Sequence, residues 1–283
     1  MDIVAHATTV DYLVIGHITI DNTAQGPMVG GTAAYAALNA RQHGLRVGIF
    51  TSYGNELPLD ALQGIQIINI PTSTSSTFEN VYTETGRVQK IWNVASELNI
   101  GDLPDAWKRA KIIHLAPVAN EILPFDPAVI KADILGVTPQ GWLRKWDDDR
   151  AIRSSHWNPD IEQILQASVA VLSSEDLEHD ESSIEHFAHS CKILNVTEGV
   201  NGSRLYWNGD IRKFPARVVS ETDPTGAGDI FASSFFIRLL ATRDPWEAAR
   251  YANQLAAFSV TRRGMQSIPT TEEIRLALVE VLS

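Results

Sequence analysis

The chain has 283 residues and a single cysteine, Cys191, so no disulfide can form within it. One cysteine in a chain of this length is typical of a reducing, cytoplasmic setting, where we expect it to be a small buried hydrophobic residue. No apolar run approaches the length that spans a bilayer, and the N-terminus lacks a basic segment. We therefore expect a cytoplasmic protein without a membrane partner.

Positive charge is also scarce. The chain has 23 Lys and Arg against 34 Asp and Glu, a formal net charge of −11. This acidic excess is repelled by phosphate-rich surfaces, so we expect no nucleic-acid partner. The strings G-x-x-x-x-G-K-S/T, G-x-S-x-G and H-E-x-x-H are all missing, which removes the usual support for P-loop, α/β-hydrolase and zinc-protease functions.

The most informative segment that is present starts at Asp223 and reads D-P-T-G-A-G-D-I-F. Gly226 and Gly228 allow a tight turn, and the helix expected after them would aim its first amides at an anion. Asp229 in that first turn could accept the proton of a substrate hydroxyl. The alternative is a plain helix start, in which Thr225 or Asp223 caps the helix and Asp229 complements its dipole.

A second glycine segment lies far upstream. Gly30 and Gly31 precede an alanine-rich run that ends at Gly44, which predicts a helix whose start lets a small ligand approach bare backbone. A buried alanine helix without a ligand is the alternative. Before it, Asp21 and Asn22 follow an apolar stretch; a carboxylate suits a vicinal diol, with Asn22 as a candidate second hydroxyl ligand, and an exposed turn residue is the alternative for Asp21.

Short β-branched runs alternate with longer helical patterns, which predicts one α/β domain over residues 1–283 with a doubly wound, mostly parallel sheet. Residues 77–98 instead alternate polar and apolar positions around a turn, so we expect a small β-strand lid there, with a contribution from 16–29. The predicted strands are 12–15, 47–51, 112–115, 134–137, 169–172 and 193–197. The predicted helices are 32–43, 160–167, 182–189, 228–241, 246–261 and 271–282.

Together the two glycine segments resemble the two signatures of the ribokinase-like, or phosphofructokinase-B, carbohydrate kinases, with Pro224 where the family normally has threonine. The resemblance covers essentially the whole chain. It implies a ribokinase-like fold, ATP and Mg²⁺ as cofactors, Asp229 as the catalytic base, and an anion hole from Gly226, Ala227 and Gly228. K⁺ dependence and a homodimer through the lid stay open.

The resemblance also implies an acceptor site. Its candidate residues are Asp21, Asn22, Gly30, Gly31, Tyr35, Glu79, Asn80, Arg87 and Gln140. Many family members carry a sugar-binding asparagine where this chain has Tyr35. An aromatic ring there could stack on the C–H face of a cyclic polyol, as in an inositol-kinase-like branch, or on the base of a nucleoside. For the lid residues, an ordinary solvated hairpin is the alternative.

The remaining candidates concern the donor and metals. Those for the nucleotide are Thr197, Gly199, Gly202, Asn253 and Gly264, although a hairpin turn and a groove-capping amide explain some of them equally well. The family's Asn-x-x-Glu magnesium motif is altered, with Ser174 in place of the asparagine. Glu175 and Glu178 are the candidates for the outer shell of Mg²⁺, or else an acidic helix start. Asp223 and Thr225 are the candidates for a monovalent cation.

We therefore expect a kinase that transfers the γ-phosphate of ATP to a hydroxyl of a sugar or cyclic polyol. A nucleoside kinase is the enzymatic alternative. A member of the family that binds a polyol or nucleotide without turnover is the alternative from another class, motivated by the altered magnesium motif.

Overall fold

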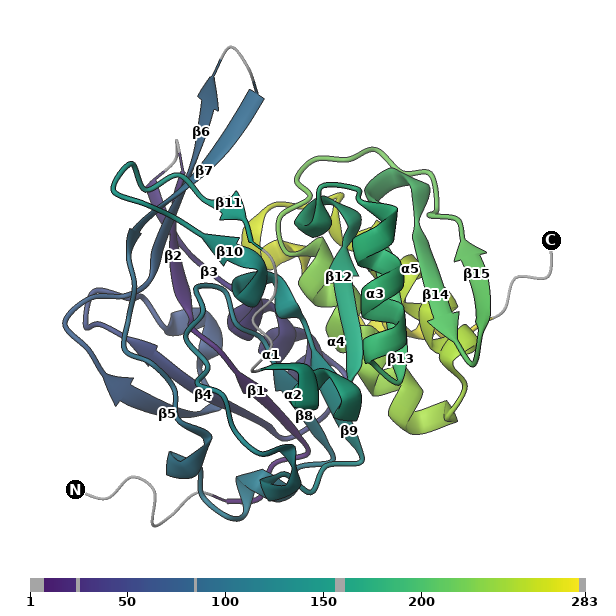
Figure 1. Ribbon diagram of the computed structural model, residues 1–283, viewed down its shortest axis with the longest axis horizontal. Helices are drawn as coiled ribbons and strands as arrows, with labels where there is room; N and C mark the ends of the chain where they lie inside the picture. The colour runs from purple at the N-terminus through teal and green to yellow at the C-terminus, as the bar shows by residue number, and fades with distance from the viewer. Residues whose placement is uncertain (1–7, 24–25, 84–85, 156–160, 280–283) are drawn as a thin grey trace.

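In the computed structural model, a nine-stranded sheet forms the centre of the molecule (Figure 1), in the order β15-β14-β13-β12-β9-β8-β1-β4-β5. Residues 8–23, 26–83, 86–155 and 161–279 are described, except for the side chains of residues 81–87. The strands from β13 to β5 run parallel, and β14 and β15 are antiparallel. Their bounds are β1 (Tyr12–Ile15), β4 (Val47–Tyr53), β5 (Gln66–Pro71), β8 (Ile112–Leu115), β9 (Ile134–Val137), β12 (Val169–Ser173), β13 (Ile193–Thr197), β14 (Ser203–Trp207) and β15 (Asp210–Phe214).

The central strands are mostly apolar because both of their faces are covered. In β1 every residue is buried, with Leu13 and Ile15 in the core on one face of the sheet and Tyr12 and Val14 in the core on the other. Helices α1 (Thr32–Gln42), α4 (Ala227–Thr242) and α5 (Pro245–Ser259) cover this second face, and α2 (Glu162–Ala167) and α3 (Glu181–Ser190) cover the first. The predicted doubly wound, mostly parallel fold is confirmed. No helix within the described residues is long and apolar enough to cross a membrane.

All six predicted strands are present, and their bounds agree to within two residues. Helix α5 begins where expected, because Asp244 Oδ1 accepts the amides of Trp246 and Glu247 ahead of Pro245. The last helix, α6 (Thr271–Leu278), stops before residue 282, where the predicted helix ends, and residues 280–283 lie outside the described residues. The strands β5, β14 and β15 were not predicted; β5 and β15 are the edges of the sheet, where strands carry more polar residues, and β14 lies next to β15.

A separate four-stranded sheet, which we call the small sheet, has the order β3-β2-β6-β7. Its strands are β2 (Thr19–Thr23), β3 (Gly26–Gly30), β6 (Thr77–Thr83) and β7 (Gly86–Asn93). A two-stranded arm, β10 (Arg144–Lys145) and β11 (Arg153–Ser154), lies beside it (Figure 1). The loop of this arm bonds to the free edge of β7: the amide of Ile91 donates to the Arg150 carbonyl at 3.0 Å and that of Ile152 to the Gln89 carbonyl at 2.8 Å. The small sheet is therefore joined to the large sheet by these hydrogen bonds to the arm as well as by the chain segments that connect them.

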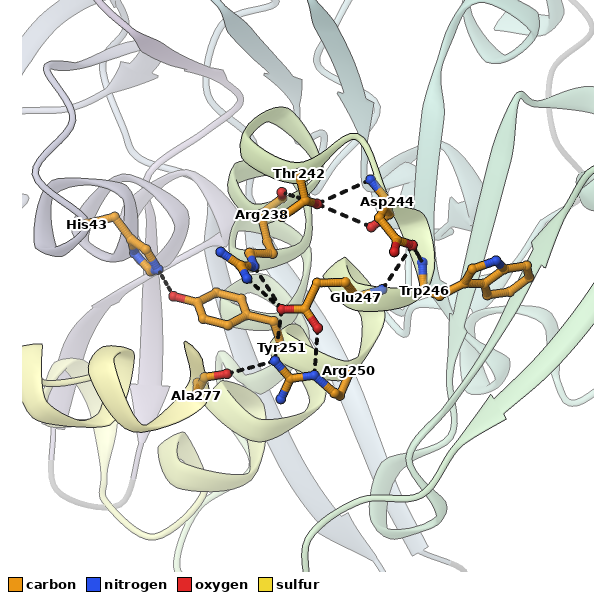
Figure 2. Close-up of polar contacts among 9 residues, drawn as sticks. All are labelled: His43, Arg238, Thr242, Asp244, Trp246, Glu247, Arg250, Tyr251 and Ala277. Carbon is orange, nitrogen blue, oxygen red and sulfur yellow. Dashed lines mark hydrogen bonds and ion pairs between the residues drawn. The ribbon is translucent and has the colours of Figure 1, made fainter. Parts of the chain in front are cut away.

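A half-buried polar cluster connects helices α1, α4 and α5, which cover the same face of the large sheet (Figure 2). Glu247 of α5 accepts hydrogen bonds from Arg238 of α4 at 2.7 Å and from Arg250 at 2.6 Å. Tyr251 Oη lies 2.8 Å from His43 Nε2, which connects α5 to the end of α1. The cluster thus sets the position of α4, the helix that carries Asp229.

Replacing Glu247 with alanine is expected to lower the free energy of unfolding by about 1–3 kcal/mol, because it leaves two arginines without their carboxylate. Burial raises the pKa of Glu247, but hydrogen bonds from Arg250 and Arg238 outweigh it, so the net pKa lies below the ordinary 4.5. This stabilisation is therefore complete above pH 4.5 and is lost as pH falls through the lowered pKa. Urea unfolding at several pH values measures both effects.

Glu272→Ala is the matched control, because it breaks an exposed pair with Arg275 at 2.7 Å within α6. It should leave the unfolding midpoint essentially unchanged. An equal effect of the two substitutions would contradict a special role for the Glu247 cluster.

Candidate active site

The glycine turn ahead of α4 presents bare backbone to open space. Gly226 is the N-cap residue, with φ 81°, and no side chain caps the helix. Asp223 Oδ1 instead accepts the amide of Thr225 at 3.0 Å, so the alternative in which Asp223 or Thr225 caps α4 is wrong. A Cβ atom added to Gly228 would meet no atom within 4 Å. The Ala227 amide donates to the Pro224 carbonyl at 3.1 Å, and the helix ladder begins with the Ile230 amide. The amides of Gly228 and Asp229 are therefore left for a ligand in the space beside Gly228.

The carboxyl group of Asp229 lies in the first turn of α4, where four other elements act on it. Burial raises its pKa from 3.8 to about 6, a hydrogen bond from the Thr32 hydroxyl of α1 lowers it, and the charge of Asp21 of β2 raises it. The charge of Arg144 lowers this pKa and that of Asp176 raises it. A carboxylate with a pKa close to the working pH is suited to act as a general base.

The acceptor candidates Asp21 and Gly30 lie against each other in the paired strands β2 and β3. A Cβ atom on Gly30 would approach Asp21 Oδ2 to 2.2 Å, so the carboxylate occupies the space that a side chain would need. The hydroxyl group of Thr19 donates a hydrogen bond to Asp21 Oδ1 at 3.1 Å. Since the charge of Asp21 acts on Asp229, the structure brings the two glycine segments together as predicted.

Comparison with known proteins agrees with this geometry. Residues 145–272 match the model of the pfkB family carbohydrate kinases. The cytidine kinase of Thermococcus kodakarensis is 26% identical, over 91% of this chain and 99% of that kinase. Inositol 3-kinase of Zea mays is 31% identical over a matched region that covers 58% of this chain and 43% of that protein. A pyrophosphate-dependent kinase of the ribokinase family, solved with a pyrophosphate analogue and myo-inositol, is 16% identical and superposes with a TM-score of 0.75 over 93% of this chain and 99% of that one.

The chain is supported as a member of the ribokinase-like pfkB carbohydrate kinases by the family match over residues 145–272 and by its kinase relatives. It is thus a phosphotransferase that acts on hydroxyl groups, and its ribokinase-like fold is the one seen in the solved structures of the family.

Tyr35 is not placed as a stacking platform for an acceptor. Its side chain is 2% exposed, and its ring lies beneath the turn at Gly226, where an added Cβ would come within 2.5 Å of the ring. Burial raises its pKa, and the charges of Asp229, Asp21 and Asp223 raise it further. The expected stacking is therefore corrected: in this pfkB protein Tyr35 packs with Ile230 under the glycine turn and supports it from below.

Asp223 joins the glycine turn to the loop after α5. Its Oδ2 accepts the Gly264 amide at 3.3 Å, and its own amide donates to the Val260 carbonyl at 3.1 Å. Gly264 itself lies under β3, since an added Cβ would come within 2.5 Å of Met28 Cε. Thr225 is exposed. Among the described residues no group of three or more acids, histidines or cysteines could hold a metal ion, so the cation assignments stay predictions.

The nucleotide candidates divide into exposed and buried positions. Thr197 ends β13 and Gly199 is exposed in the turn that follows, whereas Gly202 is enclosed: an added Cβ would lie 1.9 Å from the Phe214 carbonyl oxygen. Asn253 is 6% exposed and donates its amide to Ser203 Oγ and to the Ala249 carbonyl. Its amide is thus engaged inside the protein, which does not favour contact with adenine.

The remaining predicted residues are distributed over the small sheet and the end of β12. Glu79 accepts the indole N–H of Trp92 at 2.7 Å, and Asn22 and Asn80 are exposed. The side chain of Arg87 lies outside the described residues. Gly31 starts α1 with φ 85°, in contact with the backbone of His17. Gln140 donates to Asp176 at 3.1 Å. Glu175 and Glu178 are exposed.

Sequence reasoning missed three residues that act on Asp229, namely Thr32, Asp176 and Arg144. Asp176 is half-buried, accepts the Ser173 amide at 3.0 Å, and has its pKa raised by burial. The Ser-x-x-Asp spacing of this capping box was the available signal, since it places an acid three residues after the end of the strand. Arg144 follows a 3₁₀ turn and has no local signal of this kind.

The pH profile of kcat/KM is expected to fall about tenfold per pH unit below pH 6, because protonated Asp229 cannot accept the substrate proton. Initial rates in constant-ionic-strength buffers measure it. An acid limb centred near pH 4 would show that Asp229 is more solvated than the structure indicates.

The two glycines of the turn should respond differently to alanine. Gly228→Ala adds a methyl group in open space, so its stability should stay within about 0.5 kcal/mol of the wild type, while kcat falls about 10²-fold if the phosphoryl group passes there. Gly226→Ala forces a positive φ and a clash with Tyr35, so it should cost about 1–3 kcal/mol of stability. Thermal unfolding and steady-state rates separate the two. Full turnover in Gly228→Ala would show that phosphate binds elsewhere.

Proposed function

We propose that this pfkB-family kinase transfers the γ-phosphate of ATP to a hydroxyl of a sugar or cyclic polyol. The observation that carries the proposal is the convergence of Asp21 and Asp229 beside the open glycine turn of α4. The kinase relatives that act on inositol support a polyol as acceptor.

In the proposed reaction, Asp21 accepts hydrogen bonds from acceptor hydroxyls and orients one of them toward Asp229. Asp229 takes the proton of this hydroxyl as its oxygen attacks phosphorus, and the bond from phosphorus to the bridging oxygen of ADP breaks. The amide of Gly228, which the helix ladder leaves without a partner, donates to the phosphoryl oxygens where negative charge develops, whereas that of Ala227 is held by the Pro224 carbonyl. Magnesium, carried in with the nucleotide, would neutralise charge on the phosphates.

The described residues fit a magnesium ion that is held mostly by the phosphates. Mg²⁺ commonly binds one or two carboxylates together with substrate phosphates. Asp176 can supply such a carboxylate directly or through water, since one carboxylate has about four lone-pair sites. Glu175 and Glu178 remain outer-shell candidates from their sequence positions.

We further propose that the small sheet acts as a lid. Its strand β2 carries Asp21 and its strand β3 contacts the Gly264 loop through Met28, so the acceptor site is bounded on one side by this sheet. A lid would exclude water that competes with the acceptor hydroxyl. A homodimer through this sheet and a requirement for K⁺ stay predictions.

A panel of acceptors and donors tests the function. Pentoses, hexoses, inositols and nucleosides including cytidine are each offered with ATP and with inorganic pyrophosphate, and phosphorylated product is followed by ³¹P NMR. Turnover of a sugar or inositol with ATP supports the proposal. Turnover of nucleosides alone favours the nucleoside kinase, and pyrophosphate alone as donor would correct the choice of ATP. Binding without turnover in any combination favours the non-catalytic alternative.

Asp229→Asn should lower kcat by about 10²- to 10⁴-fold with little change in nucleotide affinity, because asparagine keeps the shape but cannot take the proton. Asp21→Asn is the comparison, since it removes a hydroxyl acceptor and should act mainly on the KM of the acceptor. Steady-state kinetics and nucleotide calorimetry separate the two effects. Equal losses in kcat for both variants would contradict the division of roles.

A further inference from the structure

Arg144 lies at the start of the arm that joins the two sheets. It follows the 3₁₀ turn Pro139–Leu143 at the end of β9 and begins β10. Its Nη1 donates to the Val118 carbonyl at 3.1 Å, and its own carbonyl accepts the Asn120 amide at 2.8 Å. Both contacts lie in the loop after β8, so the side chain is anchored to the large sheet.

The guanidinium of Arg144 also rests on the small sheet. Its central carbon lies 5.6 Å from the ring centroid of Phe78 in β6, a residue that is 4% exposed. The loop of the same arm pairs with β7 through the Lys90–Ala151 bridge. Phe78 is the register partner of Asp21 in the paired strands β2 and β6, so Arg144 lies at the junction between the large sheet and the strands that carry Asp21.

Of the charged residues that act on Asp229, the other two are acids. The charges of Asp21 and Asp176 raise the pKa of Asp229. The charge of Arg144 lowers the pKa of both Asp229 and Asp176. Three carboxylates would repel the oxygens of a phosphate donor, so a site of this composition needs a fixed cation. Arginine suits this role, because its planar fork binds two phosphate oxygens at once and it stays protonated.

We propose that Arg144 is a catalytic residue that binds the phosphoryl group in transit between donor and acceptor. This inference rests on the proposed function. In the transfer, the acceptor oxygen forms a bond to phosphorus, its proton passes to Asp229, and the electron pair of the breaking bond leaves with the bridging oxygen of the donor. Arg144 exchanges no proton and stabilises the charge on the phosphoryl oxygens. Its planar guanidinium carries five N–H donors, one of which holds the Val118 carbonyl.

Three variants test the proposal. R144Q removes the cation and should lower kcat by about 10²- to 10³-fold, with a much smaller change in the KM of the acceptor. R144K keeps a charge and a donor for Val118, so it should fold like the wild type and lose an intermediate amount of kcat. R153Q is the matched control, because it removes an arginine from the partner strand of the same arm, where Arg153 pairs with Asp149 at the surface.

The pH profile distinguishes catalysis from a structural role. Asp229 faces the Thr32 hydroxyl, Asp21, Asp176 and Arg144, and of these only Arg144 is a cation. Its removal should move the acid limb of kcat/KM to higher pH in R144Q, whereas R153Q should keep the wild-type limb. A residue that only held the Val118 loop would change the unfolding midpoint and leave this limb in place.

The outcomes separate this inference from the proposed function. If the wild type turns over and folded R144Q keeps kcat within about twofold with an unchanged acid limb, Arg144 is not catalytic. If the wild type turns over no acceptor, the proposed function fails, and calorimetry with inorganic pyrophosphate still tests the residue. Weaker binding in R144Q than in R153Q then supports anion binding by Arg144, and equal binding overturns it.

Discussion

The site depends on the partial desolvation of one carboxyl group at the start of α4. Burial raises the pKa of Asp229 to about 6, and the neighbouring charges and the Thr32 hydroxyl act in opposite directions on it. The group is therefore ionised at neutral pH and remains basic enough to accept a proton. This balance requires elements from across the chain to meet at one point, which the crossovers of a parallel sheet make possible because its strands end at a common edge.

Glycine serves two different purposes in this site. Gly228 leaves an open space for a ligand, whereas Gly226 and Gly30 leave space for protein side chains, namely the ring of Tyr35 and the carboxylate of Asp21. The signature thus combines an open turn with two packing requirements. Tyr35 joins these roles physically, because its buried ring lies beneath the turn and within reach of the charges of three aspartates.

The position of α4 is held from both of its ends. Near its C-terminus the Arg238–Glu247–Arg250 cluster joins it to α5 (Figure 2). Nearer its start, the buried amide of Asn39 in α1 donates to the hydroxyls of Ser233 and Ser234, each at 2.8 Å. Rigid placement of this helix matters because a general base works only at hydrogen-bonding distance from its substrate. The arm with Arg144 and the small sheet then complete the site from the opposite side.

The sequence by itself determined the fold class, the central strands, most of the helices and the pairing of the two glycine segments. Those features depend on local signals: continuous apolar runs, helix caps, and glycines followed by an acid. It also pointed to Asp21 and Asp229 through their places beside those glycines. The tertiary structure alone decided that Tyr35 is buried under the turn, that Asn253 is used internally, and that Thr32, Asp176 and Arg144 act on Asp229. Side-chain direction and the meeting of distant segments depend on how the helices and sheets pack, and no short stretch of sequence encodes them.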